Sequence, residues 1–481
     1  MDAEALACQR AGVELNEYAR FDGIDLRALI GRGVVSAAEV QAVAREAIET
    51  ANATVNGLAQ PLFEQGLAHD PDGPYGGVPL LLKDGPMAEG VEFNVGSRAL
   101  NGIRARHDSD LMGRFRAAGL TALGVTSVPE LALSFATEPL RNGPTRNPWD
   151  LERGVGGSSG GAAALVAAGA VPIAHANDSA GSIRIPASCC GVVGLKPSRG
   201  RVPTGPDSAD PAFGAAAEFA ITRSVRDAQR LLLAIQGPGV GDKYEAPSLR
   251  TYAEKLGADG RPKRPVAVST GSWSGGAVDP EVVAVTERAA RLVEEWGYHV
   301  VPAQPRLDWD DVVQAAVAEV VAIAAPFLNA PRRPNIDQLE AVSRQIMIEA
   351  DALSAMDLMR MLDAQNRVSR QVGAFFTEHE LLITPTFGQL PLPHGTLSSD
   401  RPGYTVESWL RTLFDVGPFT VPFNLGGQPA ISLPLGASAS GLPIGVQLVA
   451  AYGREDLLLR VAARFERELP WADRIAPHGI G

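Results

Sequence analysis

Glycine and serine residues concentrate in residues 153–203, at both ends of a segment that reads as one helix followed by one strand. Glycine is needed where the backbone takes a positive φ or comes close to a ligand. Serine supplies a hydroxyl that becomes a nucleophile only when a base lies nearby. Two such loops, joined by a helix and a strand, can be brought face to face. The stretch therefore predicts a site for serine chemistry.

The base that would activate a serine has two candidates. Only one of the seven histidines, His175, lies in the dense stretch, and a lone histidine in an apolar strand favours a structural role. Lys83 ends the apolar segment GGVPLLLKD at 76–84, where Val78 and Leu80 to Leu82 could keep its amine neutral by excluding water. A strand-end lysine in contact with water is the alternative interpretation.

Three other motifs in this part of the chain are typical of different chemistry. Each lacks a residue or element that its chemistry requires. Gly157 to Gly161 fits G-x-S-x-G, with Ser159 as the nucleophile, but that motif follows a strand and the preceding residues look like a loop. The same glycines lack the lysine of a phosphate-binding loop. The adjacent Cys189 and Cys190 have no second pair to complete a metal site, which favours apolar packing. We therefore expect neither a metal nor a cofactor.

Alternating strands and helices must position these groups, which indicates an α/β fold. Residues 36–54 form a helix that opens with a Ser36–Glu39 capping box. The remaining expectations are a strand over 76–84, a helix and then a strand over 108–130, a loop over 141–161, a helix over 162–170, a strand over 171–178 and a loop over 179–187. Further along, we expect helices over 223–236, 279–297 and 454–468, strands over 264–270, 381–386, 429–436 and 443–450, and a mostly helical stretch over 310–375.

Composition narrows the functional class. The chain has 481 residues, with 43 Lys+Arg against 55 Asp+Glu, so its net charge of −12 argues against nucleic acid as a partner. Three cysteines indicate a reducing compartment, and the acidic N-terminus does not look like a signal peptide, so we expect a cytoplasmic protein. The best candidate for a membrane span, 312–328, carries Glu319 in its middle and Pro326 near its end, which argues against one.

Four long motifs in this order resemble the amidase signature family, and the resemblance runs over nearly the whole chain. They are GGVPLLLKD at 76–84, GGSSGG at 156–161, SAGSIRIPA at 179–187 and GVVGLKPSRGR at 191–201. Within the family the chain looks most like the 6-aminohexanoate-cyclic-dimer hydrolase group and the related aryl and small-molecule amidases. The resemblance implies one amidase domain over 1–481, built on a large mixed, twisted β-sheet with helices on both faces. Its catalytic core would span about 70–240, a variable substrate-pocket region 300–415, and C-terminal strands and a helix 420–470.

The resemblance also assigns roles, carried over by motif position. It implies a Ser–cisSer–Lys triad in which Lys83 is the base, Ser158 after a cis peptide bond from Gly157 is the bridge, and Ser182 is the nucleophile. An oxyanion hole would use the backbone N–H groups of Ser179, Ala180, Gly181 and Ser182. Ser159 would support the triad, and Asp178 and Arg184 would anchor the loop as a charge pair. Much of the family has glycine where this chain has Ala180, and alanine restricts φ.

These assignments imply a hydrolase of small or medium amides that forms an acyl-enzyme on Ser182. Linear and cyclic amides, anilides, carbamates and esters all present a suitable carbonyl. The alternative is an amidotransferase component that works together with partner proteins, and a monomer or homodimer fits the hydrolase. For the apolar pocket lining we name Met87, Val128, Leu131, Phe135 and Phe419.

Overall fold

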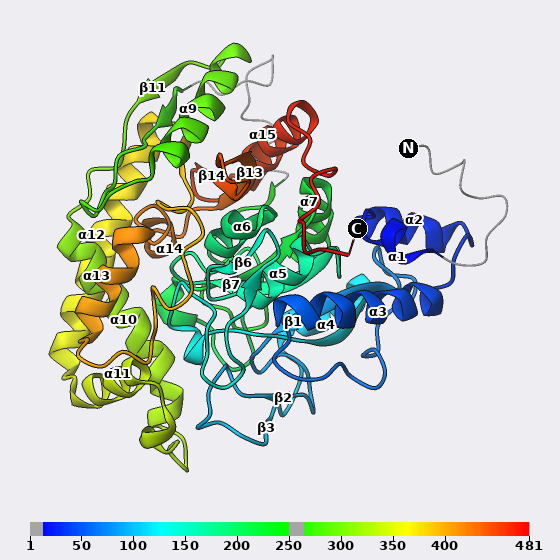
Figure 1. Ribbon diagram of the computed structural model, residues 1–481. Coiled ribbons are helices and arrows are strands. Elements are labelled where there is room, and N and C mark those ends of the chain that lie inside the picture. Colours follow the sequence, from blue (N-terminus) through cyan, green and yellow to red (C-terminus); the bar gives the residue numbers. More distant parts are fainter. Residues whose placement is uncertain (1–12, 250–263, 481) are drawn as a thin grey trace.

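A ten-stranded mixed β-sheet organises the computed structural model, which describes residues 13–249 and 264–480 (Figure 1). The strand order is β11-β10-β12-β14-β13-β8-β9-β7-β1-β4. The strands are β1 (Val78–Lys83), β4 (Leu120–Thr126), β7 (Ile173–Asp178), β8 (Val193–Lys196), β9 (Ala217–Thr222), β10 (Val266–Val268), β11 (Val300–Pro302), β12 (Leu381–Pro385), β13 (Ala430–Ala437) and β14 (Pro443–Ala450). Parallel pairs lie toward both edges, whereas the central strands pair antiparallel. The expected large mixed sheet is confirmed.

Helices cover both faces of this sheet. In one layer α4 (Asp110–Ala118) contacts α7 (Val225–Ile235), which contacts α15 (Glu455–Glu468). In the other layer α3 (Ala37–Val55) contacts α5 (Gly160–Ala167), which contacts α6 (Arg184–Cys190). The capping box expected at Ser36 is present at the start of α3. The chain also forms the helices α1 (Leu15–Tyr18), α2 (Gly23–Gly31), α9 (Pro280–Glu295) and α14 (Pro422–Leu425).

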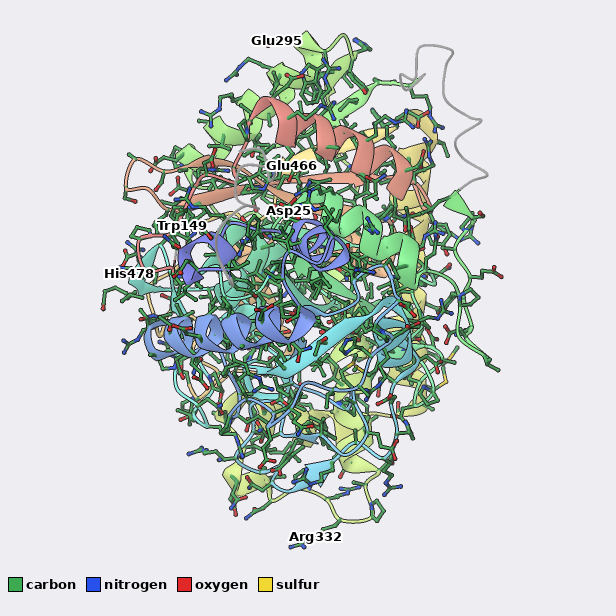
Figure 2. All side chains as sticks on the ribbon, turned by 90° about the vertical axis from the view of Figure 1, so that its right-hand side faces the viewer. Asp25, Trp149, Glu295, Arg332, Glu466 and His478 are labelled. Atoms are coloured by element: carbon green, nitrogen blue, oxygen red, sulfur yellow. The ribbon has the colours of Figure 1, made fainter. Side chains whose placement is uncertain are left out.

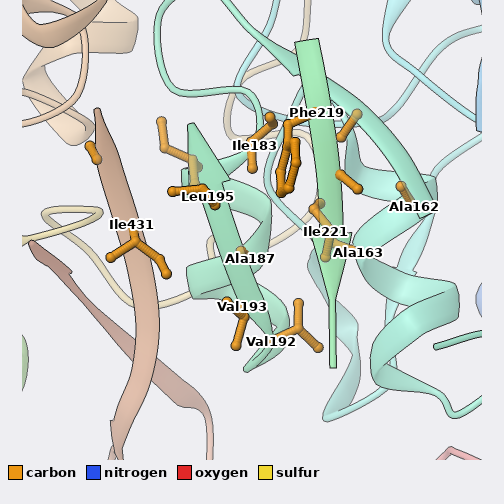
Figure 3. Close-up of a cluster of buried hydrophobic side chains, with 14 of the residues drawn as sticks. Ala162, Ala163, Ile183, Ala187, Val192, Val193, Leu195, Phe219, Ile221 and Ile431 are labelled. Atoms are coloured by element: carbon orange, nitrogen blue, oxygen red, sulfur yellow. The ribbon is translucent and has the colours of Figure 1, made fainter. Parts of the chain in front are cut away.

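Small and branched apolar residues fill the space between the helices α5 and α6 and the centre of the sheet. Figure 3 shows Ala162 and Ala163 of α5 on one side of Phe219, and Ile183 and Leu195 on its other side. All of these side chains are fully buried. A Cβ atom at Gly161 would lie 2.3 Å from the Gly57 carbonyl oxygen, so only glycine lets α5 approach this closely. The packing fixes the starting points of α5 and α6, where the serines lie.

A block of four helices packs beside the end of the sheet. It consists of α10 (Trp309–Leu328), α11 (Ala341–Ala352), α12 (Ala355–Glu378) and α13 (Val406–Val416), and α10 contacts the other three (Figure 1). Of the described helices, α10 alone is long and apolar enough to cross a membrane by length and composition. Its packing against three helices and the burial of Glu319 within it are typical of a core helix. The exposed charges, such as Glu295 and Arg332 at opposite ends of the view, lie at the periphery (Figure 2).

The structure confirms most of the expected elements and corrects two. The expected loop over 141–161 contains a short hairpin of β5 (Arg146–Asn147) and β6 (Asp150–Gly154), so a strand does precede the G-x-S-x-G motif. This ribbon is separate from the main sheet. The expected loop over 179–187 turns into α6 at Arg184. Pro186 falls in the first turn of α6, where proline costs no intrahelical hydrogen bond, so it does not stop the helix.

Candidate active site

The ends of two neighbouring parallel strands bring the candidate base to the serine-rich loops. Strand β1 pairs in parallel with β7, and Leu81 lies opposite Ala174. Because the carboxyl ends of parallel strands meet at the same edge, Lys83 at the end of β1 lies beside Asn177 near the end of β7. The site therefore forms where β1 and β7 stop.

Lys83 is almost completely enclosed, with 2% of its surface exposed. Its Nζ atom lies 2.8 Å from Ser158 Oγ and 2.5 Å from Asn177 Oδ1. Burial lowers the pKa of Lys83 to about 8, against the opposing effect of the Glu218, Asp178 and Asp84 carboxylates. About a tenth of the amine is therefore neutral at pH 7, and about half at pH 8. The alternative of a solvent-exposed strand-end lysine is wrong.

A chain of hydrogen bonds through His175, Glu218 and Asn177 positions Lys83. The Lys83 backbone N–H donates to His175 Nδ1 at 3.2 Å, which requires the other ring nitrogen to carry the proton. His175 Nε2 therefore donates to Glu218 Oε2 at 2.8 Å, and Asn177 Nδ2 donates to Glu218 Oε1 at 3.3 Å. His175 thus has the structural role that its strand position favours. Because Asn177 uses its amide nitrogen on Glu218, its oxygen faces Lys83.

Both candidate serines lie just before the first turn of a helix. Ser158 precedes α5, and the Gly157–Ser158 peptide bond is cis. Ser182 precedes α6, and the Ser159 N–H donates to the Ser182 carbonyl at 3.2 Å, which joins the two loops. The Ser159 hydroxyl donates to the Asn177 carbonyl. The Ser182 hydroxyl makes no hydrogen bond to any residue in 13–249 or 264–480, and catalytic contacts of this kind often tighten only when substrate binds.

The loop before Ser182 carries several backbone N–H groups without a protein partner. Within the described part of the chain, those of Ser179, Ala180 and Ser182 donate to no protein acceptor. The Gly181 N–H differs, because it donates to Asp178 Oδ1 at 2.8 Å. Ala180 keeps a negative φ, so alanine causes no strain there, and its carbonyl accepts from Thr420 Oγ1. Three of the four expected oxyanion donors are therefore free to meet a ligand, and the fourth stabilises the loop.

Asp178 and Arg184 form a fully buried ion pair beneath this loop. Two Arg184 nitrogens donate to Asp178 at 2.8 and 2.9 Å, and Asn424 Nδ2 donates to Asp178 Oδ1. Burial alone would raise the pKa of Asp178, but the Arg184 charge and its hydrogen bonds hold that pKa below its ordinary value. The Asp178 carboxylate also accepts from the N–H groups of Gly181 and Ile183. The pair therefore fixes the backbone on both sides of Ser182.

A cavity opens over Ser182 and is closed on its far side by the four-helix block. Its lining residues are Ala132 to Phe135, Ser179, Ala180 and Ser182 on one side, and Ala316, Glu319, Val320, Ile323, Trp409, Leu410, Leu413 and Phe414 on the other. Trp409 Nε1 donates to the Leu133 carbonyl at 2.8 Å, which holds α13 against the loop that carries Phe135. The cavity is predominantly apolar, and its polar lining residues are Ser134, the serines of the loop before α6, and Glu319.

The five expected pocket residues are distributed over different places. Phe135 lines the cavity over Ser182. Met87 lines a separate cavity that Lys83 also lines. Val128, Leu131 and Phe419 line neither of these cavities and are buried in the core, where Phe419 packs edge-on against Trp273. Apolar type alone cannot separate lining residues from core residues, because both are shielded from water.

Sequence reasoning missed several groups at the site. Asn177 and Glu218 hold Lys83, and only the pairing of β7 with β9, which places Glu218 opposite Asn177, brings them together. Glu319 did give a signal, since it is the one charge inside the apolar run 312–328, but its position beside Ser182 depends on tertiary packing. Cys189 and Cys190 are buried in α6. Burial raises the pKa of the Cys189 thiol to about 12, as expected for apolar packing.

Known proteins resemble this chain in both sequence and structure. The family model described as Amidase matches residues 26–459. A curated relative, the 6-aminohexanoate-cyclic-dimer hydrolase of Paenarthrobacter ureafaciens, is 38% identical over 470 residues, covering 93% of this chain and 94% of the relative. A solved structure of 6-aminohexanoate cyclic dimer hydrolase complexed with substrate aligns with a TM-score of 0.88 at 38% identity, covering 96% of this chain and 99% of that chain. The solved structure of a glutamyl-tRNA(Gln) amidotransferase subunit from Thermotoga maritima aligns with a TM-score of 0.72 at 26% identity, covering 96% of this chain and 97% of that chain.

Proposed function

Because this chain belongs to the amidase signature family and is a hydrolase of carbon–nitrogen bonds in amides, we propose that it acts through an acyl-enzyme on Ser182, with Lys83 as base and Ser158 as bridge. The observation that carries the proposal is the position of Lys83 Nζ between Asn177 Oδ1 and Ser158 Oγ. The Asn177 oxygen can only accept, so the amine must donate to it. When the amine is neutral, its lone pair is left for the Ser158 proton.

The first half of the reaction forms the acyl-enzyme. Neutral Lys83 accepts the Ser158 hydroxyl proton, Ser158 accepts the Ser182 proton, and Ser182 Oγ bonds to the substrate carbonyl carbon. The oxyanion that develops is stabilised by the N–H groups of Ser179, Ala180 and Ser182, which need no reorganisation at that moment. The C–N bond then breaks, and the proton returns through Ser158 to the leaving nitrogen. An amine leaves because it is protonated.

The second half releases the acid. A water molecule gives a proton to the Ser158–Lys83 pair and bonds to the acyl carbon, and the returning proton restores the Ser182 hydroxyl. The proton that Ser182 loses passes through Ser158 to the leaving amine and is replaced by one from water, whose hydroxyl group ends on the acid, so the cycle balances with water as the one co-reactant. The reaction would run on this chain's own residues alone.

For the substrate we propose a small or medium uncharged amide. The predominantly apolar cavity over Ser182 supports an organic chain on one side of the scissile bond. The relative named for a cyclic dimer of 6-aminohexanoate supports linear or cyclic amides of that size. Anilides, carbamates and esters present the same carbonyl to Ser182 and belong to the same proposal.

A substrate panel on the purified chain tests this function against the amidotransferase alternative. We expect the lone chain to hydrolyse an anilide, a lactam or a carbamate, with all turnover lost in Ser182→Ala. Glutaminase activity that appears only after partner proteins are added would instead favour the amidotransferase. The 38% identity to the cyclic-dimer hydrolase, against 26% to the amidotransferase structure, supports the hydrolase.

A further inference from the structure

Glu319 is a buried acid that faces the cavity over Ser182. It lies on α10 with 3% of its surface exposed, and it lines the same cavity as Ser179, Ala180 and Ser182. Its Oε1 atom is fully buried, and no hydrogen-bond partner for it exists among residues 13–249 and 264–480. Leaving a buried polar atom unpaired is costly, so such an atom at a binding cavity indicates a group that pairs with the ligand.

The cation whose charge acts on Glu319, Arg199, is hydrogen-bonded to other groups. Arg199 acts on Glu319 only through its charge, because the Arg199 guanidinium donates to the carbonyl oxygens of Gly214, Asn424 and Leu425. Of the described residues, none forms an ion pair with the Glu319 carboxyl. Burial, together with the negative charge of Asp178, raises the pKa of Glu319 above its ordinary value. The enclosed position therefore favours the neutral carboxylic acid over the carboxylate in the free enzyme.

We propose that Glu319 is a specificity-determining residue that binds a second, uncharged amide or carbamate group of the substrate, away from the bond that is cleaved. This inference rests on the proposed function of the Ser182 site and names its substrate class. A neutral carboxylic acid offers one O–H donor and one carbonyl acceptor. It can therefore pair with either the carbonyl or the N–H of that second group. An ammonium end would require a charged carboxylate, which the enclosed position and the nearby Asp178 oppose.

Two series of amides would test this assignment. The first series consists of p-nitroanilides that carry the variable end group on the acyl chain, and the second consists of amides that carry it on the leaving amine. Within each series the chains have equal length and end in a methyl, a carboxamide or an ammonium group. We expect the unmodified enzyme to prefer the carboxamide end over the methyl end by about tenfold or more in kcat/KM in one series. In Glu319→Leu that ratio should fall to about one, whereas Glu319→Gln, which keeps a donor and an acceptor, should retain most of it.

The variants should fold, because Glu319→Leu removes a buried unpaired polar group, and we expect its melting temperature to be equal or higher. Ile323→Val, on the same helix and cavity, is the matched control and should change all end groups alike. An unchanged carboxamide-to-methyl ratio in Glu319→Leu would overturn the proposal. A preference of the unmodified enzyme for ammonium that Glu319→Gln abolishes would also overturn it, since the carboxyl would then act as an anion. Turnover in Ser182→Ala that stays near the rate of the unmodified enzyme would refute the proposed function itself, whatever the ratios.

Discussion

Two regions meet at the candidate site, and they differ in how their polar groups are held. The floor of the candidate site, made of β1, β7 and the loops that open α5 and α6, pairs Lys83, Asp178 and Arg184 with several partners each. The helical wall, made of α10 and α13, is predominantly apolar where it borders the cavity over Ser182, and Glu319 Oε1 has no hydrogen-bond partner within the described residues. The floor is preorganised for one reaction, whereas the wall is free to select the substrate. Substitutions in the floor should therefore change the rate for all substrates alike, and substitutions in the wall should change the preference among substrates.

The largest effect is expected for Ser182→Ala in the floor. Removing the proposed nucleophile should lower kcat by about four orders of magnitude or more for every amide tested, because the remaining hydrogen bonds cannot form an acyl-enzyme. Steady-state assays with several substrates, with circular dichroism to check folding, would measure this. A loss that spares one substrate class would break the distinction between floor and wall.

Lys83→Ala should cost about three orders of magnitude in kcat/KM at neutral pH, with partial recovery at high pH as hydroxide replaces the base. In the unmodified enzyme kcat/KM should rise with pH through about 8, because the amine works only when neutral. The matched control is Lys196→Met. Burial lowers the pKa of Lys196 to about 7, but its Nζ donates to the Pro197 carbonyl and to neither serine. In Lys196→Met the rise of kcat/KM near pH 8 should persist. Loss of that rise in Lys196→Met would identify Lys196 as the base.

Asp178→Ala should be the most destabilising of these floor variants, by about 3–5 kcal/mol in the free energy of unfolding. It leaves Arg184 buried without its carboxylate and frees the N–H groups that hold the loop. Urea denaturation would measure the change. The exposed pair Arg333–Asp351 on the wall side provides the control, since Asp351→Ala should cost about 1 kcal/mol or less. Equal losses in the two variants would remove the distinction between a rigid floor and a tolerant surface.

The smallest effect is expected for Glu218, which is hydrogen-bonded to His175 and Asn177 next to Lys83. The Glu218 carboxylate raises the pKa of Lys83, so Glu218→Gln should lower that pKa and move the midpoint of the kcat/KM profile to lower pH, by up to about one unit. A merely structural role of Glu218 would reduce kcat without moving the midpoint. Glu152→Gln, an exposed carboxylate outside this network, should leave the midpoint in place.

The floor was largely predictable from sequence and the wall was not. Glycines and serines in fixed order mark the loops that begin α5 and α6, and an apolar strand ending in Lys83 marks β1. Partners that lie far away in sequence could not be predicted, since Glu218 reaches Asn177 only through strand pairing and Thr420 reaches Ala180 only through the fold. In the wall, apolar helices predict burial but not which face borders a cavity. Val128 and Phe419 therefore lie in the core, whereas Trp409 and Phe414 line the cavity.

The most direct test of the central claim is to locate the covalent intermediate. The enzyme would be incubated with a fluorophosphonate that phosphonylates activated serines, and the modified peptide identified by mass spectrometry. We predict one equivalent of label on Ser182, and none in Ser182→Ala. Label on Ser158 or Ser159, or full labelling that persists in Ser182→Ala, would contradict the account.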